Sequence, residues 1–161
     1  MISNLNIAET LSTGPDAAAC IKGGKSNPDI KGEVKLYQTC HGVLVKAEFH
    51  SLPLRSENNK NPIFAFHIHG GTCCRDCGNE PFPDSGTHFD KGKHTHPYHA
   101  GDMPPLFSNS GYALSIFLTN RFCVNDVIGK AIILHSQADD FTSQPSGNAG
   151  EKIACGIIKK C

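Results

Sequence analysis

Apolar and polar side chains alternate along several short stretches of the chain, and a period of two is typical of a half-buried β-strand. In residues 42–51 the apolar side chains fall on one face and the polar side chains on the other: Val43, Val45, Ala47 and Phe49 against Lys46, Glu48 and His50. Further strands are predicted at Ala17–Gly23, Gly32–Thr39, Ile63–His69, Tyr112–Thr119, Val127–His135 and Ile153–Lys159. A sustained helical periodicity is hard to find, so the pattern predicts an all-β fold.

The connections between these strands include one tight turn and three long loops. Thr39-Cys40-His41-Gly42 is predicted to be a hairpin turn in which the glycine supplies a positive φ. Long connections rich in Gly, Pro, Asn and Asp occupy residues 70–87, 90–110 and 136–150. Strands this short suit a β-sandwich or a flattened barrel. Long loops in a compact domain are usually functional or disordered, so these three loops are where functional side chains are expected.

Length and charge narrow the class of protein. The 161 residues suit one domain over 1–161, with a flexible N-terminal segment at 1–16. The formal net charge is zero and no basic block occurs, which argues against a nucleic-acid partner. The longest apolar runs are far too short to span a bilayer, so no membrane partner is expected. Residues 1–16 contain no Lys, no Arg and no sustained apolar stretch, so we expect a cytoplasmic protein, although a mature secreted chain fits equally.

Histidine is distributed unevenly along the chain. Six of the nine histidines lie in residues 67–99, together with three of the eight cysteines. His67 and His69 are two residues apart on a predicted strand, so both imidazoles point to one face and Ile68 points to the other. Two imidazoles on one face form half of a metal site. Taken alone, they fit a pair of partly exposed surface histidines equally well.

A second set of metal-binding side chains lies in a Gly/Pro-rich loop. It consists of His88, His96, His99 and Asp102. Three imidazoles and one carboxylate suit tetrahedral zinc. His135 ends an apolar strand outside the cluster, where a lone histidine is more often a surface residue than a ligand. His135 becomes a candidate ligand only together with the other histidines, because a set of four imidazoles is chemically sensible for copper.

At this point the sequence resembles the copper/zinc superoxide dismutase family, in its bacterial type, over roughly residues 17–159. The segments that carry the resemblance are Phe66-His67-Ile68-His69, Gly86-Thr87-His88-Phe89, His99-Ala100-Gly101-Asp102-Met103-Pro104, Leu134-His135 with Asp139, and residues 147–156. They are independent motifs in the family's order, so coincidence is a poor explanation. The resemblance implies an eight-stranded Greek-key β-sandwich, or flattened barrel, with long metal-binding and electrostatic loops.

The resemblance also implies two metal sites, with one copper and one zinc per chain. The implied copper ligands are His67, His69, His88 and His135. The implied zinc ligands are His88, His96, His99 and Asp102. The catalytic His88 would then bridge the two metals as imidazolate, while His96 is preferred to His94 because it follows His88 by the family's usual eight residues. Asp139 resembles the family's carboxylate that links a copper histidine to a zinc histidine.

The family also has one intrachain disulfide that joins the first metal loop to the last strand. The resemblance implies Cys155 as one partner, and the other lies in residues 72–77. Cys74 has the spacing expected of bacterial-type members, and Cys73 is the alternative. Closing a loop of about 80 residues would stabilise the fold by about 4 kcal/mol on the chain-entropy model.

The implied reaction converts superoxide to oxygen and hydrogen peroxide by redox cycling of copper, with zinc supporting the bridging histidine. The family's active-site cation is usually Arg, and here it is Lys152. Lysine keeps the charge but lacks the two-pronged donor, so we expect lower but retained activity. The alternative function is a non-catalytic member of the same fold that stores or delivers copper and zinc. The family includes dimers and monomers, so a homodimer is one of the expected states.

Overall fold

The computed structural model describes residues 4–54, 62–77 and 80–161. Its strands are β1 (Ala17–Gly23), β2 (Lys31–Thr39), β3 (Gly42–His50), β4 (Ile63–Phe64), β5 (Phe66–His69), β6 (Leu106–Phe107), β7 (Ala113–Thr119), β8 (Ala131–His135), β9 (Lys152–Ile157) and β10 (Lys159–Lys160). The helical elements are short: α1 (Ile7–Ser12), α2 (Val124–Val127) and the 3-10 helix η1 (Pro83–Ser85).

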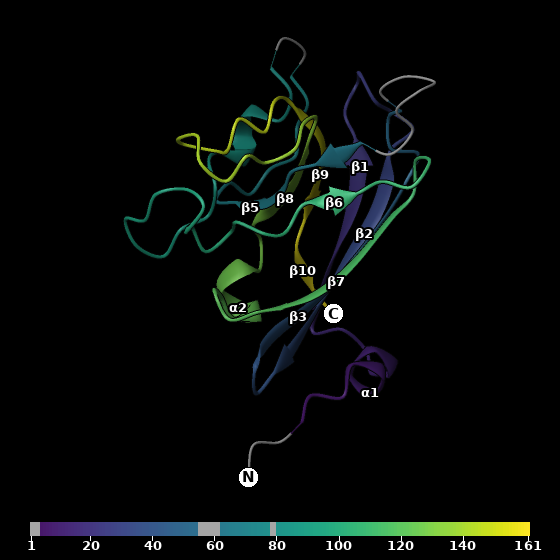
Figure 1. Cartoon of the computed structure of the whole chain (residues 1–161), viewed down its shortest axis with the longest axis vertical. Helices are drawn as coiled ribbons and strands as arrows, with labels where there is room; N and C mark the ends of the chain where they lie inside the picture. Colours follow the sequence, from purple (N-terminus) through teal and green to yellow (C-terminus); the bar gives the residue numbers. More distant parts are fainter. Residues whose placement is uncertain (1–3, 55–61, 78–79) are drawn as a thin grey trace.

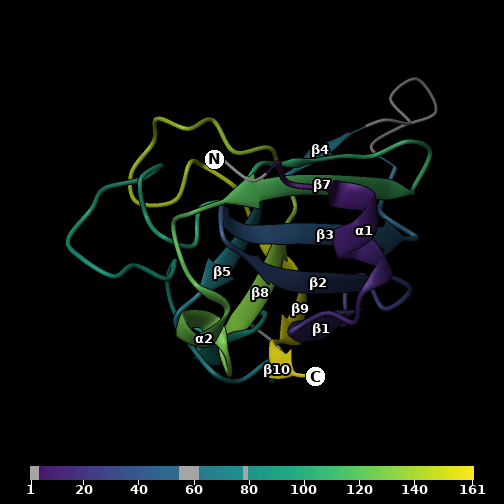
Figure 2. The same ribbon diagram turned by 90° about the horizontal axis from the view of Figure 1, so that it is seen from below.

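Most strands belong to one antiparallel sheet with the order β5-β8-β9-β1-β2-β3-β7, and β10 pairs with β1. β4 and β6 form a separate two-stranded sheet. Neighbours in the large sheet are often distant in sequence, as β5 is from β8, which is typical of Greek-key connections. The large sheet curls around its own inner face (Figures 1 and 2). This arrangement confirms the predicted all-β fold class.

The hydrophobic core lies on the inner face of the curled sheet and follows the predicted alternation. The four apolar side chains expected to face inward from β3 are fully buried: Val43, Val45, Ala47 and Phe49. The Phe49 ring meets the Phe66 ring edge to face, with 5.7 Å between centroids, and so packs β3 against β5. Gly32 leaves room for this ring, because a Cβ there would lie 2.6 Å from it.

The turn between β2 and β3 has the predicted form. Thr39 pairs with Gly42, so Cys40 and His41 form a two-residue connection. Gly42 has a φ of +126°, which disfavours any residue with a side chain. A Cβ at Gly42 would also collide with the carbonyl oxygen of Thr119 on β7. Glycine is therefore required here both for the backbone angle and for the close approach of two strands.

Two predicted strands are shorter than expected. Residues 63–69 divide at Ala65, whose N–H donates to Gln137 O and whose carbonyl accepts from His135 N–H, so β4 and β5 enter different sheets. Residues 127–130 belong to no strand, because the short helix α2 ends at Val127 and a turn follows it. Gly129 has a φ of +80° in this turn, and β8 begins only at Ala131. A four-residue helix is too short to give a periodic signal in the sequence.

Helix α1 lies in the N-terminal segment, where Asn6 caps it by accepting a hydrogen bond from Glu9 N–H at 3.2 Å. The two ribbon views place α1 beside the outer face of β7, β3 and β2 (Figures 1 and 2). Among the described residues, no helix has the length and apolar character needed to cross a membrane.

The three long loops gather on one side of the sheet, next to β5 and β8 (Figures 1 and 2). They cover the outer face of these strands, opposite the core. Ile68, Ile132 and Leu134 point into the core from β5 and β8. The alternate positions on the same two strands therefore point toward the loops.

Candidate metal centre

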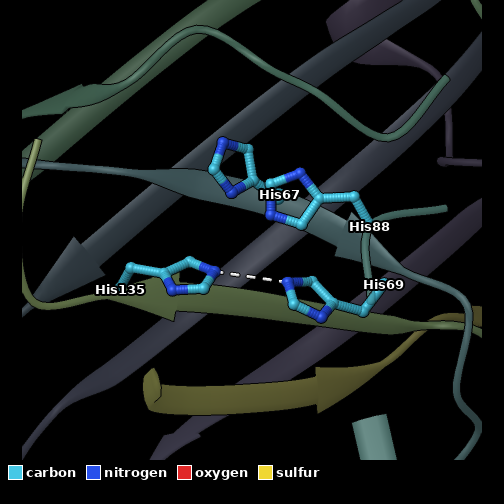
Figure 3. Close-up of side chains that lie close together, drawn as sticks. All are labelled: His67, His69, His88 and His135. Carbon is cyan, nitrogen blue, oxygen red and sulfur yellow. Dashed lines mark hydrogen bonds between the residues drawn. The ribbon is translucent and has the colours of Figure 1, made fainter. Parts of the chain in front are cut away.

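Strands β5 and β8 present three histidines on their outer face. His67 pairs with Ile133 and His69 with Ala131, so these residues share one face of the sheet. His135, two residues after Ile133, falls on that face as well. All three rings are buried, with exposed fractions of 0%, 2% and 4% for His67, His69 and His135. Figure 3 shows the rings turned toward one another above the two strands.

The fourth histidine of this group, His88, comes from a loop that is hydrogen-bonded to β5. Phe89 N–H donates to Ile68 O at 2.8 Å, and Ile68 N–H donates to Gly101 O at 2.9 Å. These bonds hold the two ends of the loop against the strand. The His88 ring then lies 4.1 Å from the His67 ring and 5.0 Å from the His69 ring, measured between centroids.

Two groups of donors result, and they share His88. The first group is His67, His69, His88 and His135. The second group is His88, His96, His99 and Asp102. Within each group, one donor atom from every residue lies within 4.8 Å of the others. The structure therefore brings together all the residues predicted as metal ligands, including His135 from far along the chain.

Hydrogen bonds determine which nitrogen of each ring in the first group carries the proton. His67 Nε2 donates to Asp139 Oδ2 at 2.7 Å, and His69 Nδ1 donates to Gly86 O at 2.8 Å. His135 Nδ1 donates to Gly150 O at 3.3 Å. In a neutral ring the other nitrogen is then a bare acceptor. Each of these three rings therefore turns a lone pair toward the centre of the group.

These lone pairs fit a metal ion. His67 Nδ1 and His88 Nε2 are buried and have no hydrogen-bond partner among the described residues. His69 Nε2 and His135 Nε2 lie only 3.2 Å apart, along the dashed line in Figure 3. Since both rings already hold their proton on Nδ1, these two acceptors face each other without a hydrogen between them. A cation bound by all four nitrogens satisfies them together, and imidazole nitrogens suit copper.

Burial favours the uncharged form of the three rings from β5 and β8. Removal from water lowers the pKa of His69 to about 2 and that of His135 to about 3. The pKa of His67 is also lowered by burial, although the Asp139 carboxylate acts against this. Metal ions bind the neutral ring, so the side chains are held in the form that coordination requires.

In the second group, Asp102 contacts all three imidazoles. Its Oδ1 accepts from His88 Nδ1 at 2.6 Å, and its Oδ2 lies 3.2 Å from His96 Nδ1 and 3.1 Å from His99 Nδ1. Burial raises the Asp102 pKa, but the His88 hydrogen bond and the three rings outweigh it and lower this pKa to about 2. His96 Nδ1 and His99 Nδ1 are buried without a hydrogen-bond partner among the residues described. Three nitrogens and one oxygen fit tetrahedral zinc.

Asp139 connects the two groups. One carboxylate oxygen accepts from His67 Nε2 at 2.7 Å and the other from His96 Nε2 at 2.8 Å. Burial acts to raise the Asp139 pKa, but the hydrogen bonds from His67, Phe141 N–H and His96 leave it below its usual value. His94, the alternative to His96, is exposed and pairs with Asp90 at 2.8 Å, so it belongs to neither group.

Sequence reasoning missed Gln144. Its side-chain Oε1 accepts from His96 N–H at 3.1 Å, and its Nε2 donates to His96 O at 2.7 Å. The amide thus holds both backbone groups of one residue in the second donor group. An amide in a Ser/Pro/Gly loop has no periodic or charge signal, so nothing in the sequence distinguishes it from a solvated side chain.

The predicted disulfide partner and active-site cation lie beside the first group. Cys74 and Cys155 are joined by a disulfide, which attaches residues 70–87 to β9. Lys152 Nζ donates to Phe82 O at 3.2 Å and to Gly86 O at 3.3 Å. Gly86 O also accepts from His69, so the lysine supports the backbone that orients this ring. Partial burial lowers the Lys152 pKa.

The fold and the site define a class of protein: an all-β domain with two adjacent metal-binding groups that share one histidine. The family model described as copper/zinc superoxide dismutase (SODC) matches residues 30–158. The chain therefore belongs to the copper/zinc superoxide dismutase family.

Named relatives agree with this assignment. The chain is 32% identical to "Superoxide dismutase [Cu-Zn] 1" of Aquifex aeolicus, with 99% of this chain and 94% of the relative covered. It is 31% identical to a Legionella pneumophila copper/zinc superoxide dismutase, with 93% and 91% covered. The solved copper/zinc superoxide dismutase from Brucella abortus superposes with a TM-score of 0.73 at 21% identity, covering 88% of this chain and 98% of that one. This last likeness supports the fold.

Proposed function

We propose that this chain is a catalytic superoxide dismutase in which copper binds to His67, His69, His88 and His135, and zinc to His88, His96, His99 and Asp102. The observation that carries the proposal is the set of buried, unpartnered ring nitrogens that converge in two groups with His88 in common. When bound, copper supplies one-electron redox chemistry with superoxide and zinc supplies a fixed positive charge.

The protein's own groups hold and move protons around these sites. The carbonyls of Gly86 and Gly150 keep the protons of His69 and His135 on Nδ1, which leaves both Nε2 atoms as donors to a metal. His88 alone belongs to both groups, so its Nε2 is the position where a proton can be held and passed to a reduced substrate. Asp139 prevents His67 and His96 from rotating, because each ring donates to one of its oxygens.

Lys152 is proposed to attract the substrate. Superoxide is a small anion, and a local positive charge raises its encounter rate even on a neutral protein. The lysine has three N–H donors, and the carbonyls of Phe82 and Gly86 take two of them. Among the described contacts the third has no acceptor, and it can donate to an anion that approaches the first group.

Metal analysis combined with a superoxide-consumption assay tests this proposal. Protein loaded with copper and zinc should consume superoxide, and His69→Ala should lose this activity together with copper. A matched control is His94→Ala, which removes an exposed histidine outside both groups. If the loaded wild-type protein binds both metals and consumes no superoxide, the storage or delivery function replaces the catalytic one.

Three further expectations stay proposals. The first is a single domain over residues 1–161, which limited proteolysis tests. The second is a cytoplasmic location, against which the Cys74–Cys155 disulfide weighs, since disulfides persist mainly in oxidising compartments. Cell fractionation decides between the cytoplasm and an oxidising compartment.

The third is a homodimer. Support comes from β7, where Leu114, Ile116 and Leu118 are 50%, 40% and 42% exposed on its outer face. Such a row of aliphatic side chains is a candidate self-association surface. Sedimentation velocity of the wild-type protein and of Ile116→Lys tests it, since the lysine should convert a dimer into a monomer.

A further inference from the structure

One arginine outside both donor groups contacts the loop that carries the proposed zinc ligands. Arg121 follows β7, and its Nη1 lies 2.7 Å from Pro97 O, 3.1 Å from His99 O and 3.4 Å from Asp102 O. This nitrogen has two hydrogens, so it donates fully to the two nearer carbonyls and shares a hydrogen with the third. Two of the three carbonyls belong to proposed zinc ligands.

The contacted turn couples these two ligands to each other. His99 N–H donates to Asp102 Oδ2 at 2.9 Å, and Asp102 N–H donates to His99 O at 3.2 Å. A shift of either peptide therefore moves both donors. Residues 89–101 form no regular strand or helix, and the backbone joins this turn to β5 at its end, where Gly101 O accepts from Ile68 N–H at 2.9 Å.

Arg121 reaches the turn from a well-anchored part of the fold. Phe122, the next residue, is 2% exposed and belongs to the main core cluster. Val124 is also in that cluster, and its N–H donates to Gln38 Oε1 at 2.9 Å. The guanidinium thus connects a loop without regular structure to the rigid sheet.

The arginine has two opposite effects on a cation in the second group. Its hydrogen bonds hold the ligand-bearing peptides in place, which favours binding. Its positive charge repels a dication, which disfavours binding. Because Arg121 is an exposed residue, water and salt screen the charge effect, whereas the hydrogen bonds at 2.7 and 3.1 Å remain. The positioning effect is therefore the larger one.

We propose that Arg121 is a positioning residue for zinc, which holds His99 and Asp102 in their binding arrangement through the backbone of residues 97–102. The inference rests on the proposed zinc site. It makes the zinc affinity of this chain depend on a side chain that touches no metal ligand atom.

Zinc affinity of the metal-free protein, measured by competition with a chromophoric chelator, tests the inference directly. Arg121→Met keeps the aliphatic stem and removes the donors, and its zinc affinity should fall by about 10- to 100-fold, the usual effect of losing a partner that orients ligands. Arg121→Lys keeps N–H donors and charge, so it should recover much of the loss. Copper affinity of both variants should stay close to that of the wild-type protein, since the first group lies mainly on strands.

The matched control is Arg75→Met, which removes another exposed arginine, paired with Asp84 at 3.5 Å and away from residues 97–102. It should bind zinc as the wild-type protein does. Cobalt bound in place of zinc adds a spectroscopic test, because its visible absorption reports the coordination geometry and should change in Arg121→Met alone.

The outcomes separate this inference from the proposed function. Unchanged or higher zinc affinity in Arg121→Met overturns the positioning role and leaves the zinc site intact. An equal loss of zinc and copper affinity, without recovery in Arg121→Lys, also overturns it, because Arg121 would then support the fold in general. A wild-type protein that binds no zinc overturns both the inference and the proposed zinc site.

Discussion

The two donor groups are built differently, although they share His88. In the first group, His67, His69 and His135 come from two paired strands, so sheet register sets their spacing. In the second group, His96, His99 and Asp102 come from a loop without regular structure. That loop is paired to β5 at residues 101–102, and the side chains of Asp139, Gln144 and Arg121 hold it elsewhere.

The two groups show two ways in which a protein can preorganise a metal site. The strand-borne ligands need little besides the fold, because neighbouring strands place their side chains at fixed intervals. The loop-borne ligands depend on hydrogen bonds from other segments, so the loss of any one of these bonds is expected to weaken metal binding. We therefore expect changes outside the sheet to affect zinc more than copper.

The largest effect is expected from breaking the disulfide, which holds a loop against the strand-borne group. Cys155→Ser should destabilise the protein by about 4 kcal/mol, because the bridge closes a long loop. The sequence separation of the two cysteines is 81 residues. Denaturant unfolding measures the loss, and Cys77→Ser, which removes a free thiol of the same loop, is the control. Equal stability of the two variants would contradict the prediction.

Acid should destabilise the metal-free protein through the strand-borne histidines. The folded-state pKa values of His69 and His135 are lowered to about 2 and about 3, so these rings stay neutral as the pH falls below 6.5. Unfolded rings take up protons in this window, which means that unfolding binds protons and stability falls as the pH falls. Each ring contributes about 1.4 kcal/mol per pH unit.

Denaturant unfolding of the metal-free protein at pH 7.5 and pH 5.5 measures this dependence. His135→Gln should have a smaller dependence than the wild-type protein, because one of the rings is absent. A stability that stays level between the two pH values would show that the rings are not held neutral in the folded state.

The part of the fold and of the two donor groups that the sequence could predict differs between the strands and the loops. Alternation along β3 and the spacing of His67 and His69 reveal strands and faces, because a period of two is a local property. The position of His135 beside them depends on the pairing of β8 with β5, which only a family resemblance could anticipate. Gln144 was not predicted, since a contact between two irregular loops leaves no local pattern. The division at Ala65 was missed for the same reason, as its partners are Gln137 and His135.

Asp139 offers a smaller change that acts on both groups at once. In Asp139→Asn one oxygen is replaced by an NH₂ group, which cannot accept a hydrogen bond from His67 or His96. We expect a loss of about 10- to 100-fold in zinc affinity or activity, as is usual for partners that orient metal ligands. Asp140→Asn is the control, because in the described contacts the Asp140 carboxylate accepts hydrogen bonds from Thr142 and Ser143 and from neither donor group.

The difference between the two groups predicts which one loses more metal affinity in Asp139→Asn. His67 keeps its place through the β5–β8 pairing, whereas His96 lies in a loop and keeps the Gln144 contacts to its backbone and the 3.2 Å approach of its Nδ1 to Asp102 Oδ2. Zinc affinity should therefore fall further than copper affinity. A larger loss of copper would show that the strands alone do not orient the first group.

The smallest effect is expected at Lys152, where the protein has a lysine in place of the arginine usual in the family. Lys152 Nζ already donates to Phe82 O and Gly86 O, so the support of the His69 environment does not require arginine. Lys152→Arg adds the planar, two-pronged donor for the anion, and turnover should rise by less than about tenfold, or about 1.4 kcal/mol of barrier. Lys152→Gln, which removes the charge, should lower turnover and weaken its dependence on salt. A fall in the turnover of Lys152→Arg would contradict this prediction. It would mean that the site is built around the lysine ammonium group, so that its preorganisation includes the cation as well as the metal ligands.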